Sequence, residues 1–383
     1  MPDCTLHIGG PKTGSTAIQD ALFFHLRDPL FQYVAGGEPN GTLAVSALFE
    51  DFPRCEKIFR RFGSPGGRFA PYRDRLERQW TRGLDRAVRN GTHLLISSEL
   101  LWVLPQVSLE RLRDSLASRG FQIDVRGYLR PWNAWLTSLC AHQWAHDRGR
   151  FALTSAWDDL SFQVQENTIR LWRVFGRDRV RLSLFQPAQF PQGCVVRDFA
   201  SQVGLPVPPQ FSLRSNDGFS RPAIQLAYCW HKFENPVQED ELAYPPGKFR
   251  LLGLVRQLPG PPLRFHPDLL APWRDQQRPQ DPWIERELGF SLADPPAKSP
   301  VQSPAERVIR REEDLFEFEP ETLAWLARMT GQPVLRQQSG EQAAREVARQ
   351  VSLLRFRPLT PREIRDGLIL RLRKAWIRRR WGC

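Results

Sequence analysis

The sequence predicts an α/β fold, in which helices flank a central parallel sheet and a helical extension follows at the C-terminus. Three observations favour this fold. Short apolar runs typical of buried strands alternate with segments of helical periodicity through residues 1–290. A glycine-rich turn joins the first apolar run to a helical pattern, and polar residues follow the later runs. Ligands bind beyond the carboxyl ends of parallel strands, so these polar residues are candidates for a site.

Composition narrows the class of protein. The chain has 383 residues, of which 41% are hydrophobic, and its 13 Trp and 24 Phe are ample for a buried core. A chain that is disordered throughout is thereby excluded. The net charge of +12 favours anionic partners, among them a nucleotide, an acidic glycan, a membrane surface or nucleic acid. The six cysteines show neither CxxC spacing nor Cys/His pairs at ligand spacing, so we expect free thiols and no zinc site.

The first element is a strand–loop–helix unit near the N-terminus. The apolar run Leu6-His7-Ile8 enters the glycine-rich loop 9–14, and apolar residues recur at helical spacing from Ser15 to about Arg27. The glycines permit tight turns and the close approach of a ligand. Free N–H groups at a helix N-terminus attract an anion, and Lys12 adds a full positive charge. The loop therefore predicts a phosphate site; the alternative is a glycine-rich turn with an exposed lysine.

The position of the lysine separates two kinds of phosphate loop. In an ATP-type P-loop the Lys follows the last Gly, whereas here Ser15 follows Gly14 and Lys12 lies two residues before that glycine. The segment Pro11-Lys12-Thr13-Gly14-Ser15-Thr16 resembles the 5′-phosphosulfate-binding loop of sulfotransferases that use 3′-phosphoadenosine 5′-phosphosulfate (PAPS). A kinase-like P-loop nucleotide enzyme is the alternative, and the displaced lysine argues against it.

A helical segment and a second buried strand follow. Residues 34–71, rich in Gly and Pro, are expected to form loops with a short helix near 43–50, and 72–90 returns to a helical pattern. Residues 93–99 then form a buried strand that ends at Glu99. The place of Glu99 at a strand end resembles that of a functional carboxylate in sulfotransferases; the alternatives are a helix N-cap or an ion pair.

A second motif closes the third predicted strand, residues 123–130. Arg130 ends this strand, Pro131 follows it, and Ser138 lies eight residues past the arginine. Sulfotransferases carry an Arg, a Pro and a Ser in this arrangement, and the resemblance implies that Arg130 and Ser138 hold the 3′-phosphate of PAPS. A guanidinium can form paired hydrogen bonds to a phosphate, and a Ser two turns into a helix can donate another. Alternatively, Arg130 pairs with a carboxylate and Ser138 has no partner.

The remaining elements resemble the same family more loosely. Residues 180–185 are expected to form a fourth strand and 196–204 a helix, after which a loop carries Asn216. Asn216 either reaches the cosubstrate, as the resemblance to bacterial members implies, or forms a turn. Residues 264–290 resemble the closing helices of those enzymes. The resemblance covers roughly residues 4–290, and it implies a P-loop-like sulfotransferase fold.

We expect a sulfotransferase domain (1–290), a Pro-rich linker (291–305) and a helical extension (306–383). The basic tail, residues 362–383, carries eight basic and two acidic side chains. It is expected to be a solvated helix docked on the body; the alternative is peripheral contact with the anionic inner face of a membrane or another polyanion. No specific nucleic-acid partner is expected. Because no apolar run approaches the roughly 18 residues of a spanning helix, and no export leader is visible, we expect a cytoplasmic location.

The resemblance implies transfer of a sulfuryl group from PAPS to a hydroxyl or amine of a glycan, lipid or small metabolite. Lys12 would neutralise the charge that develops as 3′-phosphoadenosine 5′-phosphate (PAP) leaves, and Glu99 would accept the proton of the acceptor. The 5′-phosphate would be held by the amides of Gly14, Ser15 and Thr16 and by the hydroxyls of Thr13, Ser15 and Thr16. No metal is expected as a cofactor.

Three histidines are weaker candidates for a role in catalysis or metal binding. His7 is a rival base, but it lies inside the first strand, where a His is more often buried and hydrogen-bonded. His142 and His146 are one helical turn apart, a spacing that permits metal binding, but no acidic or Cys partner accompanies them. A helix-surface pair is therefore expected. A non-catalytic protein that binds polyanions through the basic tail is the second alternative to a sulfotransferase.

Overall fold

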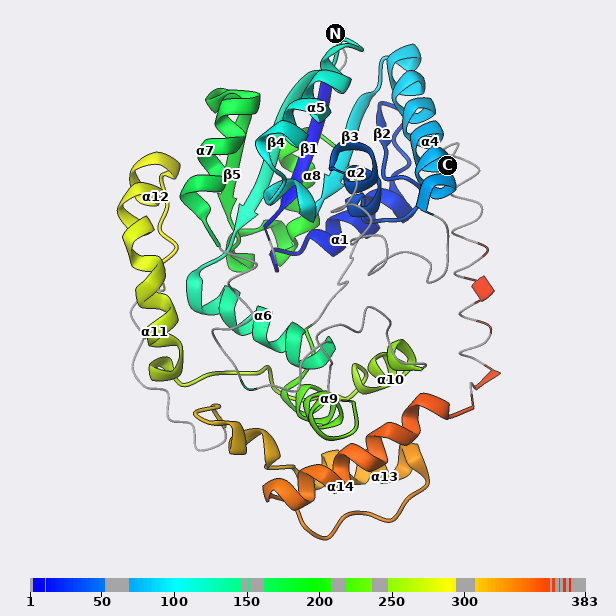
Figure 1. The fold of residues 1–383 in the computed structure, drawn as a ribbon, viewed down its shortest axis with the longest axis vertical. Helices are drawn as coiled ribbons and strands as arrows, with labels where there is room; N and C mark the ends of the chain where they lie inside the picture. The colour runs from blue at the N-terminus through cyan, green and yellow to red at the C-terminus, as the bar shows by residue number, and fades with distance from the viewer. Residues whose placement is uncertain are drawn as a thin grey trace.

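The computed structural model describes most of the chain. The described residues are 3–10, 12–51, 69–146, 151, 162–207, 218–235, 247–293, 307–358, 360, 361, 365, 368, 369 and 372. They form the predicted α/β fold, with a parallel sheet of five strands in the order β2-β3-β1-β4-β5 and helices on both faces (Figure 1). The strands are β1 (Asp3–Gly9), β2 (Phe31–Tyr33), β3 (His93–Ser98), β4 (Gln122–Leu129) and β5 (Val180–Leu184).

Strand β2 is the one the sequence does not predict. The other four strands confirm the expected ones, at 6–8, 93–99, 123–130 and 180–185, to within a few residues at their ends. β2 is three residues long and pairs with β3 at the edge of the sheet, where Phe31 lies opposite His93. A run of three residues is too short to show the period of a strand, and no element is predicted between the helix that ends near Arg27 and the loops that begin at residue 34.

The strand register places Glu99 and Arg130 at the same edge of the sheet as the loop after β1. Ile8 of β1 lies opposite Ser98 of β3 on one side and Gly127 of β4 on the other. The residues that immediately follow β3 and β4 are Glu99 and Arg130. They therefore leave the sheet at the same edge as the loop that follows β1, because the carboxyl ends of parallel strands lie together.

Side chains alternate across the sheet and build a core on each face. Leu6 and Ile8 of β1 belong to the core beneath one helical layer, and Tyr128 of β4 belongs to the core beneath the other. The first layer contains α2 (Thr42–Phe49), α4 (Phe69–Asn90), α5 (Gln106–Ala117) and α7 (Val164–Phe175). The second contains α1 (Ser15–Asp20), the π-helix η1 (Ala21–His25) and α8 (Val195–Val203).

The helix after the glycine-rich loop differs from the expected regular helix of about three turns. Regular α-helix ends at Asp20, and a π-helical turn, Ala21–His25, continues it. Ile18 and Leu22 remain buried against the sheet through this change. The widened turn fits four apolar side chains in sequence, Ala21–Phe24, beside the core.

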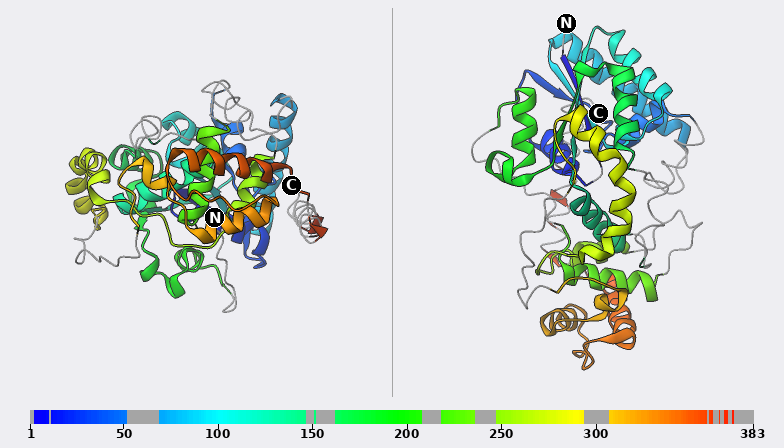
Figure 2. Two further views of the ribbon diagram at one scale, coloured as in Figure 1. Left: turned by 90° about the horizontal axis from the view of Figure 1, so that it is seen from below. Right: turned by 90° about the vertical axis from the view of Figure 1, so that its left-hand side faces the viewer.

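A helical half of the molecule lies beyond the carboxyl edge of the sheet (Figure 1). Helix α6 (Trp132–His146) leads from β4 into it, and α9 (Arg221–Phe233) packs against both α6 and α14 (Gly340–Leu353). A second view shows α14 with α13 (Pro320–Thr330) at the end of the molecule opposite the sheet (Figure 2). Helices α10 (Lys248–Val255) and α11 (Pro267–Gln277) also belong to this half, whereas α12 (Asp281–Leu288) packs against α7 beside the sheet (Figure 1).

A set of charged contacts, which we call the α9 clamp, fixes the C-terminal helices to α9. Arg221 forms an ion pair with Glu319, and Glu312 accepts hydrogen bonds from both Lys232 and Tyr228. Arg221 is buried and Glu319 is partly exposed. The C-terminal helices thus share one core with the sheet, and each cation of the α9 clamp has a carboxylate beside it.

Parts of the expected domain division lie outside the described residues. These include most of the Pro-rich linker and most of the basic tail. At the start of the expected linker, Leu292 is buried and its carbonyl accepts a hydrogen bond from the Trp132 amide at 3.0 Å. In the part of the chain that the structure describes, no helix combines the length and the apolar character needed to cross a membrane.

Candidate active site

The loop after β1 reaches its helix through two residues in the left-handed region. Gly14, the N-cap of α1, has φ of 78°, and Lys12 has φ of 66°. A Cβ on Gly14 would also lie 2.9 Å from Val195 Cγ1, so only glycine fits there. Lys12 is not a glycine, and a left-handed backbone at such a residue is a form of strain that clusters at functional sites. Pro11 lies outside the described residues.

The loop is closed by one of its own hydroxyl groups. Thr13 is buried, and its Oγ1 donates to the carbonyl of Gly10 at 2.6 Å. The single hydroxyl proton of Thr13 is therefore used within the loop and cannot also be donated to a phosphate in this arrangement. Thr16, on the first turn of α1, is exposed.

Gly9 is the point where three parts of the site meet. A Cβ at Gly9 would lie 2.0 Å from Ser15 Oγ and 3.0 Å from Glu99 Cγ, so both side chains pack directly on this glycine. Ser15 Oγ is buried and has no hydrogen-bond partner among the described residues. A buried hydroxyl without a partner costs free energy, and here it lies at a helix N-terminus, where an anion would satisfy it.

Lys12 and Glu99 influence each other electrostatically. Burial lowers the pKa of Lys12, the nearby Glu99 carboxylate opposes this shift, and the positive charges of Arg130 and Arg256 add to it. Burial likewise raises the pKa of Glu99, while Lys12 opposes that shift. We call these four residues the loop cluster. Within the described residues, Glu99 is the one carboxylate among the charges that act on Lys12.

Arg130 connects the end of β4 to the loop. Its Nη1 donates to the carbonyl of Lys12 at 3.0 Å, and its guanidinium lies over the ring of Phe185, 5.4 Å from the ring centroid. No carboxylate of the described chain pairs with it, which argues against the alternative that Arg130 is a structural ion-pair partner. The geometry instead ties the strand-end arginine to the backbone of the lysine.

The structure does not bring every expected residue into contact with the loop. Ser138 is half-buried on α6, the helix that starts two residues after Arg130, and its hydroxyl makes no hydrogen bond with a described residue. Its role in holding a 3′-phosphate stays a prediction. Asn216 lies outside the described residues, so its role also stays a prediction.

Two residues of the site were missed in the sequence. Phe185 directly follows β5, and its ring lies between Gly14 and Arg130; an aromatic residue at a strand end was the available signal. Arg256 follows α10 and acts on Lys12 although it is far away in the sequence. No local pattern distinguishes Arg256 from the many other arginines of the chain.

His7 is unsuited to the role of base. It is fully buried, its Nδ1 lies 2.7 Å from Ser97 Oγ, and its ring contacts that of Phe199 at 5.0 Å. Burial lowers the pKa of His7 to about 3. A side chain with so low a pKa is a poor general base near neutral pH.

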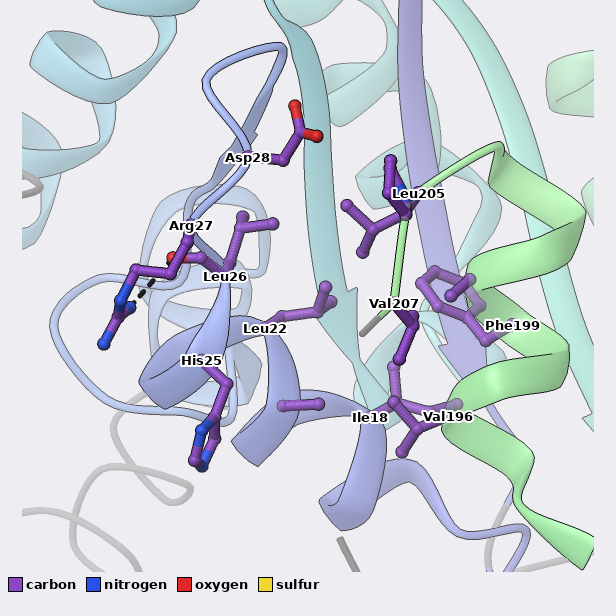
Figure 3. A pocket seen from close by; sticks show the side chains of 13 residues that line it. Ile18, Leu22, His25, Leu26, Arg27, Asp28, Val196, Phe199, Leu205 and Val207 are labelled. Atoms are coloured by element: carbon purple, nitrogen blue, oxygen red, sulfur yellow. Dashed lines mark hydrogen bonds between the residues drawn. The ribbon is translucent and has the colours of Figure 1, made fainter. Parts of the chain in front are cut away.

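An apolar cavity is lined by side chains of α1, η1 and α8 (Figure 3). Its volume is about 580 Å³, and Ile18, Leu22 and Phe199 are among the side chains that line it. Arg27 at its rim donates to the carbonyls of Leu26 and Phe24, at its own helix end. Because its lining is mostly apolar, the cavity suits an apolar ligand and not a nucleotide.

The histidine pair on α6 is confirmed as a pair of neighbours. The ring centroids of His142 and His146 are 4.5 Å apart. Among the described residues, no group of three or more His, Cys, Asp or Glu side chains could hold a metal ion.

Comparison with known proteins gives limited information. No family model matches the chain, and no curated protein matches it. A crystal structure of a sulfotransferase from Alicyclobacillus acidocaldarius is similar to it, with 16% identity, coverage of 61% of this chain and 92% of that chain, and a TM-score of 0.34. A similarity of this size by itself establishes neither a family nor an activity for this chain.

Proposed function

We propose that the chain is a sulfotransferase that moves a sulfuryl group from PAPS to a hydroxyl or amine acceptor. The observation that carries the proposal is that Arg130 donates to the Lys12 carbonyl, which holds two cations at the loop after β1, and that the buried Ser15 hydroxyl beside them has no hydrogen-bond partner among the described residues. Like charges brought together in a half-buried place cost free energy. An anion with several charges, bound at this helix N-terminus, would offset that cost.

Each charged group of PAPS has a suitable partner. The 5′-phosphate would lie on the amides of Gly14–Thr16, where the unpartnered Ser15 hydroxyl can donate to it. Lys12 would lie against the bridging oxygen between phosphate and sulfate. Arg130, with Ser138 on the helix that follows, would bind the 3′-phosphate. The position of Lys12 before Gly14 favours this donor over the polyphosphate of a kinase-like P-loop.

The transfer needs few protein groups. The acceptor oxygen or nitrogen attacks sulfur while its proton passes to Glu99, and the bond from sulfur to the bridging oxygen breaks. PAP leaves with the electron pair of that bond, and Lys12 neutralises the negative charge that develops there. The raised pKa of Glu99 makes it a stronger base than an exposed carboxylate.

Calorimetric titration of the full-length protein with PAP, ATP and 5′-AMP tests this proposal. We expect micromolar binding of PAP and much weaker binding of the other two nucleotides. Equal affinities would favour the kinase-like alternative. Replacing Arg378, Arg379 and Arg380 of the basic tail by Gln should leave PAP binding unchanged; loss of all anion binding in that variant would favour the polyanion-binding alternative.

A further inference from the structure

The C-terminal end of the described chain exposes many of its large apolar side chains. Among the described residues ten such side chains are exposed, and half of them lie within residues 353–372. They are 46–66% exposed and comprise Leu353, Phe356, Leu368, Ile369 and Leu372. Single exposed apolar residues are common on protein surfaces, but a concentration of them indicates a surface that binds a partner.

Three of these side chains form an apolar face on the basic tail. The helical residues that the structure describes in the tail are Arg365, Leu368, Ile369 and Leu372, and they follow the C-terminal end of α14 (Figure 1). Their spacing of i, i+3, i+4 and i+7 puts them on one face of a helix. Because more than half of each of the three apolar side chains is exposed, the body of the protein does not cover this face.

The tail combines this apolar face with positive charge. Residues 362–383 contain eight basic and two acidic side chains, and also Trp376 and Trp381. The attraction of such a segment to an anionic bilayer depends on its net charge and needs no fixed geometry. A helix that is apolar on one face and rich in Lys and Arg lies in the interface of a bilayer, where Trp is also favoured.

Other partners would satisfy only one of these two properties. The phosphates of a nucleic acid would attract the basic side chains but would leave the exposed leucines and isoleucine in water. A second copy of the chain would cover the apolar face, but it would bring two positively charged tails together, and like charges repel. An anionic bilayer offers acyl chains to the apolar face and anionic head groups to the charge.

We propose that the tail binds the surface of an anionic lipid bilayer, with Leu368, Ile369 and Leu372 inserted among the acyl chains and the basic side chains at the head groups. Helix α14, which precedes the tail, packs against α9, and both share one core with the sheet. Binding through the tail therefore holds the whole molecule at the membrane surface. The proposal rests on the tail and not on the loop cluster.

Co-sedimentation of the full-length protein with vesicles tests this inference. We expect binding to phosphatidylcholine vesicles that contain about one third phosphatidylglycerol, and much weaker binding to phosphatidylcholine alone. Replacing Leu368, Ile369 and Leu372 together by Gln keeps the net charge and a good helix former. This variant should bind the anionic vesicles more weakly by more than about tenfold, because it loses the burial of three apolar side chains.

The matched control replaces three apolar residues that are exposed elsewhere. Leu30, Val107 and Val334 are 45–68% exposed, and their joint replacement by Gln should leave vesicle binding unchanged. Equal thermal unfolding of both triple variants and the wild type shows that the fold is intact.

A second variant tests the charge. Replacing Arg378, Arg379 and Arg380 by Gln should lower the affinity for anionic vesicles by more than about tenfold, and added salt should weaken wild-type binding. The affinity for PAP should be the same in all these variants. A protein that binds anionic vesicles but not PAP would remove the proposed function and leave this inference standing.

Four results would overturn the inference. Two of them are a wild type that does not prefer anionic vesicles and an apolar-face variant that binds them as tightly as the wild type. Tighter binding to duplex DNA than to anionic vesicles, kept in the apolar-face variant, would assign the tail to nucleic acid. A dimer that dissociates in that variant, without vesicle binding by the wild type, would assign the face to a second copy.

Discussion

The loop cluster and the α9 clamp use the same kinds of charged side chain in opposite ways. In the α9 clamp, Arg221 meets Glu319, and Lys232 meets Glu312. In the loop cluster, Glu99 and two arginines shift the pKa of Lys12 in opposite directions, and the hydroxyl of Ser15 at the same loop is buried without a partner in the described chain. The α9 clamp pairs each of its cations with a carboxylate, whereas the loop cluster leaves the donor of Ser15 without a hydrogen-bond partner among the described residues.

From this difference we infer that the α9 clamp contributes to stability and the loop cluster to function. A buried ion pair with both partners present holds elements together, and removing one partner is strongly destabilising. Cations beside a buried hydroxyl that has no partner among the described residues are instead an arrangement that a bound anion would stabilise. Substitutions in the α9 clamp should therefore change stability, and those in the loop cluster should change binding or turnover.

The largest effect is expected from Glu99→Gln, which removes the proposed base. Turnover should fall by roughly 10²–10⁴, with little change in PAP affinity. Because burial raises the pKa of Glu99 above its ordinary value near 4.5, wild-type turnover should fall as the pH drops through that raised pKa. The acid limb of the pH–rate profile should disappear in the variant. Glu77→Gln on the exposed side of α4 is the control, and an unchanged acid limb in Glu99→Gln would assign the base elsewhere.

The two lysines give a direct contrast between the regions. Lys12→Met keeps the aliphatic stem but removes the charge, so turnover should fall by about 10²–10³. Its melting temperature should stay the same or rise, because the lowered pKa of Lys12 shows that folding disfavours its charged form. Lys232→Met should do the reverse, losing about 1–2 kcal/mol of stability with turnover unchanged. Thermal unfolding measures the stability of both variants, and PAPS consumption measures their turnover. A Lys12→Met variant that is destabilised but has normal turnover would contradict the contrast between the two regions.

A smaller effect is expected from Glu319→Gln in the α9 clamp. The variant leaves Arg221, which is 3% exposed, without its carboxylate. We expect a loss of about 2 kcal/mol in the free energy of unfolding, at the low end for a buried pair because Glu319 is 32% exposed. Urea unfolding measures it. The Kd of PAP should not change; a change would mean that the α9 clamp and the loop cluster are coupled.

The sheet could be predicted from the sequence because its long strands are rich in apolar residues, in a run or in alternation, and polar or charged residues follow them. β3 and β4 are the clearest examples, since Glu99 and Arg130 directly follow them. β2 could not be predicted, because three residues carry no period and its existence depends on pairing with β3. The π-helical turn Ala21–His25 could not be predicted either, because its apolar residues recur at ordinary helical spacing.

The candidate site could be predicted only in part, for a similar reason. Lys12, Gly14 and Arg130 lie in short motifs whose spacing is visible in the sequence. Arg256 affects the pKa of Lys12 although it is far away in the sequence, and no spacing in the sequence encodes this effect. The hydrogen bond from the Thr13 hydroxyl to the Gly10 carbonyl likewise forms only in the folded loop and cannot be seen in the sequence.

The most direct test of the central claim is the coupling between Arg130 and the 3′-phosphate. PAP and 5′-AMP differ only in that phosphate, and their affinities for the wild type and Arg130→Ala form a thermodynamic cycle. The cycle cancels any general disturbance of the loop from losing the hydrogen bond to the Lys12 carbonyl. We predict a coupling free energy of about 1.5–3 kcal/mol, with Arg78→Ala on α4 showing none. If Arg130→Ala weakens PAP and 5′-AMP by the same factor, the loop cluster does not recognise a 3′-phosphate and the account is contradicted.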